Sequence, residues 1–498
     1  MQNINVVVIG SGFSSLTAAI SLADSGFQVT VLEKNETAGG RARQFTDKGF
    51  TFDMGPSWYW MPDVFERFFK EQGTEVSDFY KLLRLDPSYR VFFGKDDIMD
   101  IPASYGQLKA TFNSIEPGSG ERLDNFLEQA KYKYQSGMNN LVYKPGRSVL
   151  EFFDAKVLWG LVKLDIFQSF HRHLRKFFKH TKILRLLEFP VLFLGALPQN
   201  TPALYSLMNY ADIKLGTWYP QGGMHRIVEA LVTLARNKGV EFRFNQCVQQ
   251  IEVKNRRATN VTTQSNTYPA MAVVAGADYH HIEQKLLAEE YRSYKEKYWQ
   301  KRVMAPSSLI FYLGINKKLE KLEHHNLFFD RDLEPHAREI YKNPKWPKEP
   351  LFYVSVTSKT DPSVCPPDCE NLFILIPVAT DLEDRMEIRE KYYIQIMERL
   401  ESLTNQSILD HVVFKRSYAH NDFISDYNAF KGNAYGLANT LKQTALLKPS
   451  IKSKKVKNLF FTGQLTVPGP GVPPSIISGQ VAAREVFKEL KPRHERTF

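Results

Sequence analysis

Residues 6–43 read VVVIGSGFSSLTAAISLADSGFQVTVLEKNETAGGRAR, and this stretch decides the fold of the N-terminal part of the chain. Its β-branched start is typical of a buried parallel strand, and residues 28–32 (QVTVL) are typical of a second one. Between them, apolar residues recur at helical spacing from Leu16 to Ala23, and Gly26 stands where a helix-terminating glycine is common. The stretch therefore predicts a strand–helix–strand unit within a parallel sheet.

Four positions in this unit fit the recognition of a dinucleotide. Gly10 permits a tight turn after the first strand, and Gly12 lets the backbone approach a pyrophosphate at the helix N-terminus. Glu33 ends the second strand, where a carboxylate accepts hydrogen bonds from a ribose diol. Ser15 replaces the third glycine of the usual fingerprint, and this small residue should loosen the helix–strand packing without blocking it. Because both strands, the helix and the acid are in place, we predict a nucleotide site.

A second loop distinguishes FAD from NAD. Gly39 and Gly40 permit a close approach of the backbone, and Arg41 beside them can donate two hydrogen bonds to phosphate oxygens. A simple NAD dehydrogenase has no need of a second phosphate-facing loop, so the pattern favours FAD. The alternative is a solvated basic turn.

The other end of the chain repeats the arrangement of strand, loop and helix. Residues 458–463 (NLFFTG) predict a short strand, residues 464–474 a stiff loop rich in glycine and proline, and residues 475–487 a helix. Backbone amides at such a helix N-terminus suit the ribityl–pyrophosphate part and the ring edge of a flavin. Alternatively, this unit only completes the sheet.

With these motifs, the chain resembles the bacterial phytoene-desaturase-type, FAD-dependent carotenoid desaturases essentially from end to end. The matching segments are residues 6–43, 49–62 (GFTFDMGPSWYWMP), 217–231 (TWYPQGGMHRIVEAL), 273–287 (VVAGADYHHIEQKLL) and 458–483 (NLFFTGQLTVPGPGVPPSIISGQVAA). Three positions depart from the family pattern: Ser15, Gly276 where the family often has Asn, and Gln464 after the C-terminal glycine.

The resemblance implies an α/β fold with a Rossmann-like FAD-binding domain, an interleaved α+β substrate domain and a helical membrane-facing region. It implies FAD-binding parts at 1–65, 215–295 and 410–498, a substrate-binding and membrane-associating region at 66–214, and a second substrate-binding part at 296–409. The cofactor-binding residues that it implies, together with those derived above, are Gly10, Gly12, Ser15, Glu33, Lys34, Gly40, Arg41, Gly55, Pro56, Ser57, Val248, Gly463, Gly471 and Val472.

The implied reaction removes hydrogen across a saturated C–C bond next to conjugated double bonds, with hydride transfer to the flavin. It requires a long apolar tunnel, which Trp58, Tyr59 and Trp60 are expected to line near the flavin. No catalytic residue is assigned: Asp53, Asp212 and Glu188 all lie among apolar residues that could raise a carboxyl pKa, and none is preferred as the proton acceptor. Oxygen and a membrane quinone are both open as the terminal electron acceptor.

Charge and composition point to a membrane surface. The 498 residues include 65 Lys and Arg against 54 Asp and Glu, and 35 Phe, which fits either a large core or an apolar partner at an acidic surface. Residues 170–185 (FHRHLRKFFKHTKILR) contain no acid and predict a basic amphipathic helix, followed by the apolar run 189–197. We expect 170–197 to contact acidic lipids; the alternative is a helix with a basic solvent face.

Other sequence features exclude further classes. The nine-residue apolar run is about half of a membrane span. The start of the chain lacks a basic leader, and three cysteines suit a reducing compartment, so a cytoplasmic enzyme attached peripherally to the cell membrane is expected. Cys365 and Cys369 have no His or further Cys nearby, so no metal site is expected. No recognised nucleic-acid module accompanies the basic stretch.

The leading hypothesis is desaturation of an acyclic carotene, phytoene towards lycopene. Its first alternative is a later-pathway desaturase of a hydroxylated or coloured carotenoid. An amine or protoporphyrinogen oxidase is more distant, because residues 49–62 and 458–483 match the carotenoid branch more closely. A non-enzymatic lipid carrier resembling the GDP-dissociation inhibitors would be expected to lack the phosphate-facing glycines and acid, yet they are present.

Overall fold

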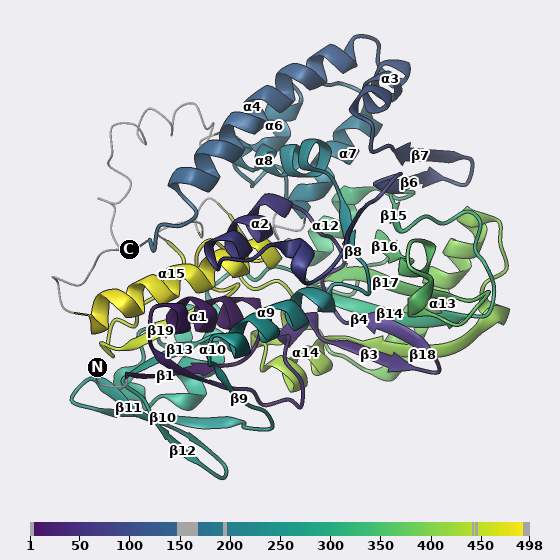
Figure 1. Cartoon of the computed structure of the whole chain (residues 1–498). Coiled ribbons are helices and arrows are strands. Elements are labelled where there is room, and N and C mark those ends of the chain that lie inside the picture. Colours follow the sequence, from purple (N-terminus) through teal and green to yellow (C-terminus); the bar gives the residue numbers. More distant parts are fainter. Residues whose placement is uncertain (1–3, 147–167, 193–196, 441–442, 444–446, 492–498) are drawn as a thin grey trace.

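The computed structural model describes residues 4–146, 168–192, 197–440, 443 and 447–491. A parallel five-stranded sheet forms the base of the first part of the molecule (Figure 1), and every neighbouring pair of its strands is parallel. In spatial order the strands are β19 (Leu459–Phe461), β13 (Ala272–Ala275), β1 (Asn5–Ile9), β2 (Gln28–Leu32) and β9 (Glu241–Arg243). The strand–helix–strand unit predicted from residues 6–43 is thereby confirmed.

Helix α1 (Phe13–Asp24) packs between α15 (Val472–Leu490) and α9 (His225–Asn237) on this sheet (Figure 1). Helix α15 begins at Val472 rather than at Ser475, where the sequence predicted it. Pro473 and Pro474 occupy its first turn, where the backbone N–H has no partner within the helix, so proline does not interrupt it. An antiparallel sheet of β10 (Val248–Lys254), β11 (Arg257–Thr263) and β12 (Thr267–Pro269) lies beside this part.

Two departures from the family pattern compensate for one another. Ser15 is buried in α1, and its hydroxyl lies where a Cβ at Gly276, just after β13, would overlap it. The glycine at 276 therefore provides the space that the side chain of Ser15 occupies.

A mixed seven-stranded sheet forms the second part (Figure 1). In spatial order its strands are β18 (Val412–Tyr418), β14 (Ser307–Ile315), β17 (Glu370–Val378), β16 (Phe352–Ser355), β15 (His325–Phe328), β6 (Tyr89–Gly94) and β7 (Asp97–Ile101). Only β15 and β6 pair in parallel. Because β18 pairs with β14, the predicted division at residue 410 assigns this strand to the wrong part: β18 belongs to the second sheet.

The central strands β14, β16 and β17 are buried on both faces and mainly apolar, whereas the edge strands β18 and β7 expose part of their residues. Phe311 and Leu313 of β14 pack with α13 (Met386–Thr404) on one face, whereas Ile310 and Tyr312 point to the opposite face, toward the first sheet. Short hairpins and helices join the two parts: β3 (Gln44–Asp47) with β4 (Phe50–Asp53), β5 (Leu82–Arg84) with β8 (Trp218–Pro220), α2 (Pro62–Glu71), α12 (Leu333–Tyr341) and α14 (His420–Tyr427).

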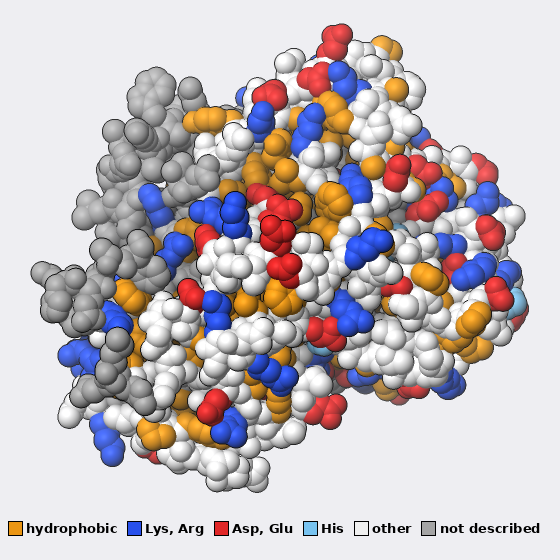
Figure 2. Space-filling model, in the orientation of Figure 1, with side chains coloured by type: hydrophobic (Ala, Val, Ile, Leu, Met, Phe, Trp, Pro, Cys, Tyr) orange, Lys and Arg blue, Asp and Glu red, His pale blue; other side chains and the backbone are white. Residues whose placement is uncertain are grey.

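A helical layer covers one side of the molecule (top of Figure 1). It consists of α3 (Tyr105–Ile115), α4 (Ser119–Asn140), α6 (Phe170–Leu174), α7 (Thr181–Leu192) and α8 (Leu207–Tyr210). Figure 2 shows hydrophobic side chains gathered below this layer, with Lys, Arg, Asp and Glu interspersed over the rest of that face. Among the described residues, no helix combines the length and the apolar character needed to cross a membrane.

The single basic helix predicted over 170–185 is wrong, because the chain forms α6 and α7 with a break between them. Three of its cations pair with acids: Arg175 with Glu188, Lys182 with Asp97, and Arg185 with Asp332. The apolar run that follows is not an exposed stretch where it is described, because Phe189 and Pro190 are buried; residues 193–196 lie outside the described part.

The packing of α1 on α15 predicts that Gly479→Ala destabilises the protein. An added Cβ would overlap the Thr17 hydroxyl and the Ser14 carbonyl, and such overpacking costs about 1–3 kcal/mol. The matched control is Gly137→Ala in α4, where the nearest atom to the new Cβ is Leu207 Cδ2 at 3.8 Å. This control should be neutral or gain about 0.5–1 kcal/mol. Thermal unfolding followed by circular dichroism measures both, and equal midpoints for the two variants would contradict the packing described.

Candidate active site

One continuous cavity of about 390 Å³ runs from the parallel sheet to the inner face of the seven-stranded sheet. Its wall includes all the predicted cofactor residues except Ser15, and two of the three predicted tunnel residues. These residues are Gly10, Gly12, Glu33, Lys34, Gly40, Arg41, Gly55, Pro56, Ser57, Val248, Gly463, Gly471, Val472, Trp58 and Trp60. Segments more than 400 residues apart in the sequence therefore meet around a single space.

Two helix N-termini line the middle of this cavity. Gly12 is the N-cap of α1 and Gly471 the N-cap of α15, so the positive ends of both helix dipoles face the same space. The amide of Gly10 donates to the carbonyl of Leu32 (2.8 Å), which fixes the turn between β1 and α1. This arrangement suits an anionic group such as a pyrophosphate.

Glu33 is held rigidly at one end of the cavity. One carboxylate oxygen accepts from the amide (2.9 Å) and hydroxyl (2.6 Å) of Ser11, and the other accepts from the amide (2.9 Å) and side chain (3.0 Å) of Asn35. The carboxylate is buried and part of the cavity wall, beside Val248 of β10. The four hydrogen bonds from Ser11 and Asn35 thus fix the orientation of the Glu33 carboxylate without a ligand.

Arg41 places a positive charge in the cavity wall, which bears on whether an anionic cofactor fits there. The guanidinium is buried, its Nε atom has no hydrogen-bond partner in the part of the chain that the structure describes, and one Nη donates to the carbonyl of Asn433 (3.3 Å). Burial lowers the pKa of Arg41, and the carboxylate of Asp278 opposes this shift. A cation in the wall of the cavity whose buried Nε lacks a partner among the described residues fits the phosphate of a dinucleotide.

The loop that carries Arg41 is fixed by a close backbone contact. A Cβ at Gly55 would overlap the carbonyl oxygen of Arg41, so only glycine is accommodated there. The contact brings Pro56 and Ser57 to the cavity wall, where the resemblance places the flavin ring.

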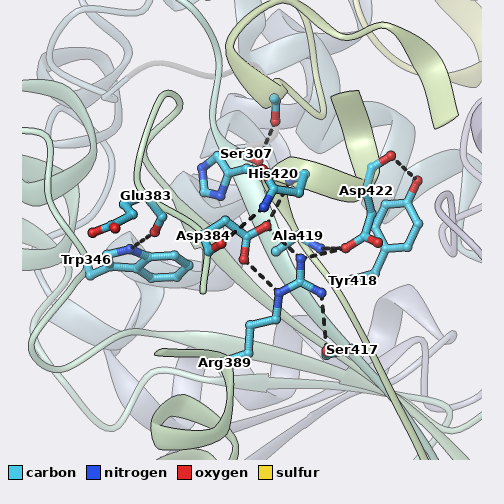
Figure 3. Close-up of polar contacts among 12 residues, drawn as sticks. Ser307, Trp346, Glu383, Asp384, Arg389, Ser417, Tyr418, Ala419, His420 and Asp422 are labelled. Carbon is cyan, nitrogen blue, oxygen red and sulfur yellow. Dashed lines mark hydrogen bonds and ion pairs between the residues drawn. The ribbon is translucent and has the colours of Figure 1, made fainter. Parts of the chain in front are cut away.

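Helix α14 closes the cavity from the side of the second sheet. The ring of Tyr427 lies 5.1 Å from the Arg41 guanidinium, and Asp426 pairs with Arg43. The N-terminus of α14 is anchored in a polar network (Figure 3), in which Arg389 of α13 binds Asp384 through two hydrogen bonds (2.7 and 2.6 Å) and Asp422 (2.7 Å).

Further contacts complete the network of Figure 3. Asp422 accepts from the amide of Ala419 (2.9 Å), and Tyr418 donates to the Asp422 carbonyl (3.2 Å). Arg389 thereby fixes the N-terminus of α14, and the C-terminal end of this helix lines the cavity. We therefore expect Arg389 to act on the cavity only through the position of α14.

The three carboxylates considered as proton acceptors are not part of the cavity wall formed by the described residues. Asp53 accepts from the amides of Met224 and His225 at the start of α9, and burial raises its pKa to about 6. Asp212 accepts from Tyr89 (2.8 Å), and burial likewise raises its pKa to about 6. Glu188 lies near His171 and pairs with Arg175. Each of the three carboxylates is therefore bound to other groups of the protein outside the cavity wall.

Two other predicted site residues lie away from the cavity. Ser15 is buried against Gly276, and Tyr59 stacks on Phe65 (ring centroids 4.2 Å apart) with its hydroxyl 3.1 Å from that of Tyr80. The prediction that Tyr59 lines the tunnel is wrong, because side chains alternate along this extended segment: Trp58 and Trp60 face the cavity and Tyr59 faces away.

The part of the cavity beyond Pro56 is mainly apolar and aromatic. Its wall contains Trp58, Trp60, Met61, Met208, Ile310 and Leu375. Sequence reasoning missed Asp278, Phe423, Asp426 and Tyr427, which also line the cavity. Asp278 stands within the matching segment 273–287 and could have been singled out; the residues of α14 carry no local motif.

Comparison with known proteins identifies the family of the chain. The sequence profile of the flavin-containing amine oxidoreductase family matches residues 13–487. The chain is 40% identical over 487 residues to a carotenoid 3,4-desaturase of Haloarcula japonica, covering 98% of each chain. It is 31% identical over 497 residues to a zeta-carotene-forming phytoene desaturase of Myxococcus xanthus, covering 98% of this chain and 94% of the relative.

Solved structures share the fold at low identity. A putrescine oxidase double mutant superposes with a TM-score of 0.63 at 15% identity, covering 98% of this chain and all of that one. An oxidoreductase of Methanosarcina mazei gives 0.61 at 15% identity, covering 96% and 99%. The chain therefore belongs to the flavin-containing amine oxidoreductase family, in its carotenoid desaturase branch, and is an FAD-dependent oxidoreductase.

Proposed function

We propose that the protein is a carotenoid desaturase that forms the double bond between carbons 3 and 4, near one end of an acyclic carotenoid. The observation that carries this proposal is the single cavity, in which a part lined by glycine turns, Glu33 and Arg41 continues into an apolar, aromatic part. The name of the Haloarcula japonica relative, 40% identical over nearly the whole chain, supports the position of the bond.

A second candidate is the desaturation of phytoene towards lycopene, which the resemblance of the sequence favoured. The Myxococcus xanthus relative supports it, at 31% identity over a similar span. The two candidates differ in where the reacting bond lies: near a chain end for the 3,4 bond, and further inside the polyene for phytoene.

Some residues of the cavity are expected to bind the cofactor and others to orient the substrate. Gly10, Gly12 and Arg41 would hold the phosphates of FAD and Glu33 its ribose, while the segment around Pro56 would lie against the ring; all of these residues line the cavity. Bound oxidised FAD supplies the hydride acceptor for one carbon of the substrate, while the neighbouring carbon loses a proton and the double bond forms between them. Trp58, Ile310 and Leu375 are placed to orient a stiff hydrocarbon and to keep water away from the reacting carbons.

Glu33→Ala should weaken the retention of FAD. The substitution removes the partner of the ribose, a charged hydrogen bond worth on the order of 1.5–3 kcal/mol. The matched control is Glu36→Ala, because Glu36 is an exposed acid in the same loop and is not part of the cavity wall. Fluorescence titration of the apoprotein with FAD measures both variants. Equal affinity of the Glu33→Ala protein and the wild type would show that Glu33 does not bind the ribose.

The proposed reaction is tested with the FAD-loaded protein and carotenoids in liposomes. We expect a carotenoid that is saturated at carbons 3 and 4 but otherwise conjugated, such as lycopene, to lose two hydrogens and to absorb at longer wavelength. Phytoene should remain unchanged. Conversion of phytoene without conversion of lycopene would overturn the 3,4 assignment and support the second candidate.

We also propose that the segment around α6 contacts the headgroups of acidic lipids, from which a carotenoid would enter the protein. Arg172, Lys176 and Lys179 are exposed there, and neither Arg172 nor Lys179 pairs with an acid among the described residues. Three cations close together gain about 1 kcal/mol each near an anionic surface.

The triple variant Arg172→Glu, Lys176→Glu, Lys179→Glu should sediment less with phosphatidylglycerol vesicles than the wild type. Pure phosphatidylcholine vesicles are the control, with which both proteins should sediment equally weakly. Undiminished sedimentation of the variant with the anionic vesicles would place the lipid contact elsewhere.

A further inference from the structure

A second, smaller cavity of about 20 Å³ lies beside the segment 53–57. Its wall includes the polar residues Asp53, Ser57 and Ser355. Among the described residues, Ser57 alone lines both this small cavity and the main one. A bound water molecule needs roughly 10–15 Å³ and two to four polar partners, so the small cavity has room for one water.

Two hydroxyls in the wall of the small cavity have hydrogen-bonding capacity to spare. Ser355 is buried, and its hydroxyl has no partner among the described residues. Ser57 Oγ accepts from the Tyr353 hydroxyl (3.1 Å) and makes no other hydrogen bond within the part of the chain that the structure describes, so its own proton is available. Buried polar groups of this kind are commonly satisfied by a bound water, and a water here would have both hydroxyls and the Asp53 carboxylate as partners.

The Asp53 carboxylate is fixed at the start of α9. One of its oxygens accepts from the amide of Met224 (2.7 Å) and the other from the amide of His225 (3.1 Å). Burial raises the pKa of Asp53 to about 6, although these hydrogen bonds and the His225 side chain oppose the shift. Tyr219 of β8 and Tyr312 of β14 also lie within electrostatic reach of Asp53, and burial raises the pKa of both, so they stay protonated. The carboxylate is therefore ionised at neutral pH and basic enough to take up a proton.

The other groups hydrogen-bonded near Ser57 are poor proton acceptors. Tyr353 donates to Ser57, and Nδ1 of His325 lies 2.6 Å from the Tyr353 hydroxyl. Burial lowers the pKa of His325 well below its usual value, so the imidazole binds a proton only weakly. Burial raises the pKa of Tyr353, so the phenol already holds its proton. The route from Ser57 through the small cavity leads instead to a carboxylate that can accept one.

We propose that a water molecule bound between Asp53, Ser57 and Ser355 carries the proton lost by the carotenoid from the main cavity to the Asp53 carboxylate. The inference rests on the proposed function, in which one carbon gives up a hydride, with two electrons, to the flavin and the neighbouring carbon gives up a proton. Ser57 Oγ takes this proton while its own proton passes to the water, and the water passes one to Asp53. Ser57 and the water thus keep their number of protons, Asp53 becomes neutral, and the electrons of the broken C–H bond form the new double bond.

The test measures the rate at which lycopene reduces the flavin of the FAD-loaded protein under anaerobic conditions, as a function of pH. In the wild type this rate should fall as the pH drops through about 6, because Asp53 accepts a proton only while it is ionised. Asp53→Asn should be slower by roughly 100-fold and should lose this pH dependence. Ser355→Val fills the small cavity but keeps Asp53 and its contacts with α9, and it should also slow the reaction. The matched control is Asp212→Asn: burial raises the pKa of Asp212 to about 6 as well, but Asp212 lines neither cavity, so the inflection should remain.

An Asp53→Asn protein that keeps the inflection, or a Ser355→Val protein that reacts at the wild-type rate, would overturn the inference. Reaction of phytoene but not of lycopene would contradict the 3,4 assignment alone, and the same variants are then compared with phytoene. A crystal structure of the FAD-loaded protein tests the water site without turnover. It should show one water within hydrogen-bonding distance of Asp53, Ser57 and Ser355, and a structure without an ordered water at this position would overturn the inference whichever carotenoid reacts.

Discussion

The close approach of two glycine turns is the constraint on which the site depends. The amide of Gly39 donates to the carbonyl of Ser11 (2.9 Å), and a Cβ at Gly40 would lie 3.2 Å from the Cα of Gly12. This contact places the Arg41 guanidinium in the cavity wall, where its Nε has no hydrogen-bond partner among the described residues. Helix α14 of the other part packs its Tyr427 ring against the same guanidinium, so this one cation contacts both parts of the molecule.

The division of the cavity into a charged and an apolar half follows from the two sheets. Helix N-termini at the edge of the parallel sheet provide amides and positive dipole ends. The inner face of the seven-stranded sheet provides Ile310 and Leu375. One cavity therefore offers a polar part that suits a dinucleotide and an apolar part that suits an elongated hydrocarbon.

Local signals predicted the strand–helix–strand unit of the first sheet well, because its turns can be formed only by particular residues. The turn at Gly10 and the acid at Glu33 are readable from spacing alone. The substrate half depends on contacts between distant segments: β18 joins β14, and Tyr427 reaches Arg41, without any motif to indicate it. The prediction for Tyr59 failed because side chains alternate along this short extended segment. Trp58 and Trp60 therefore face the cavity, and Tyr59 between them faces away.

The central claim is that FAD and an apolar carotenoid share one cavity. Anaerobic mixing of the FAD-loaded protein with a conjugated carotenoid in micelles, followed by diode-array absorption, tests it most directly. The account predicts that the absorption of oxidised flavin falls in step with the growth of a longer-wavelength carotenoid band, one equivalent of each. Lengthening of the polyene with no change in the flavin spectrum, or no change in either, would contradict it.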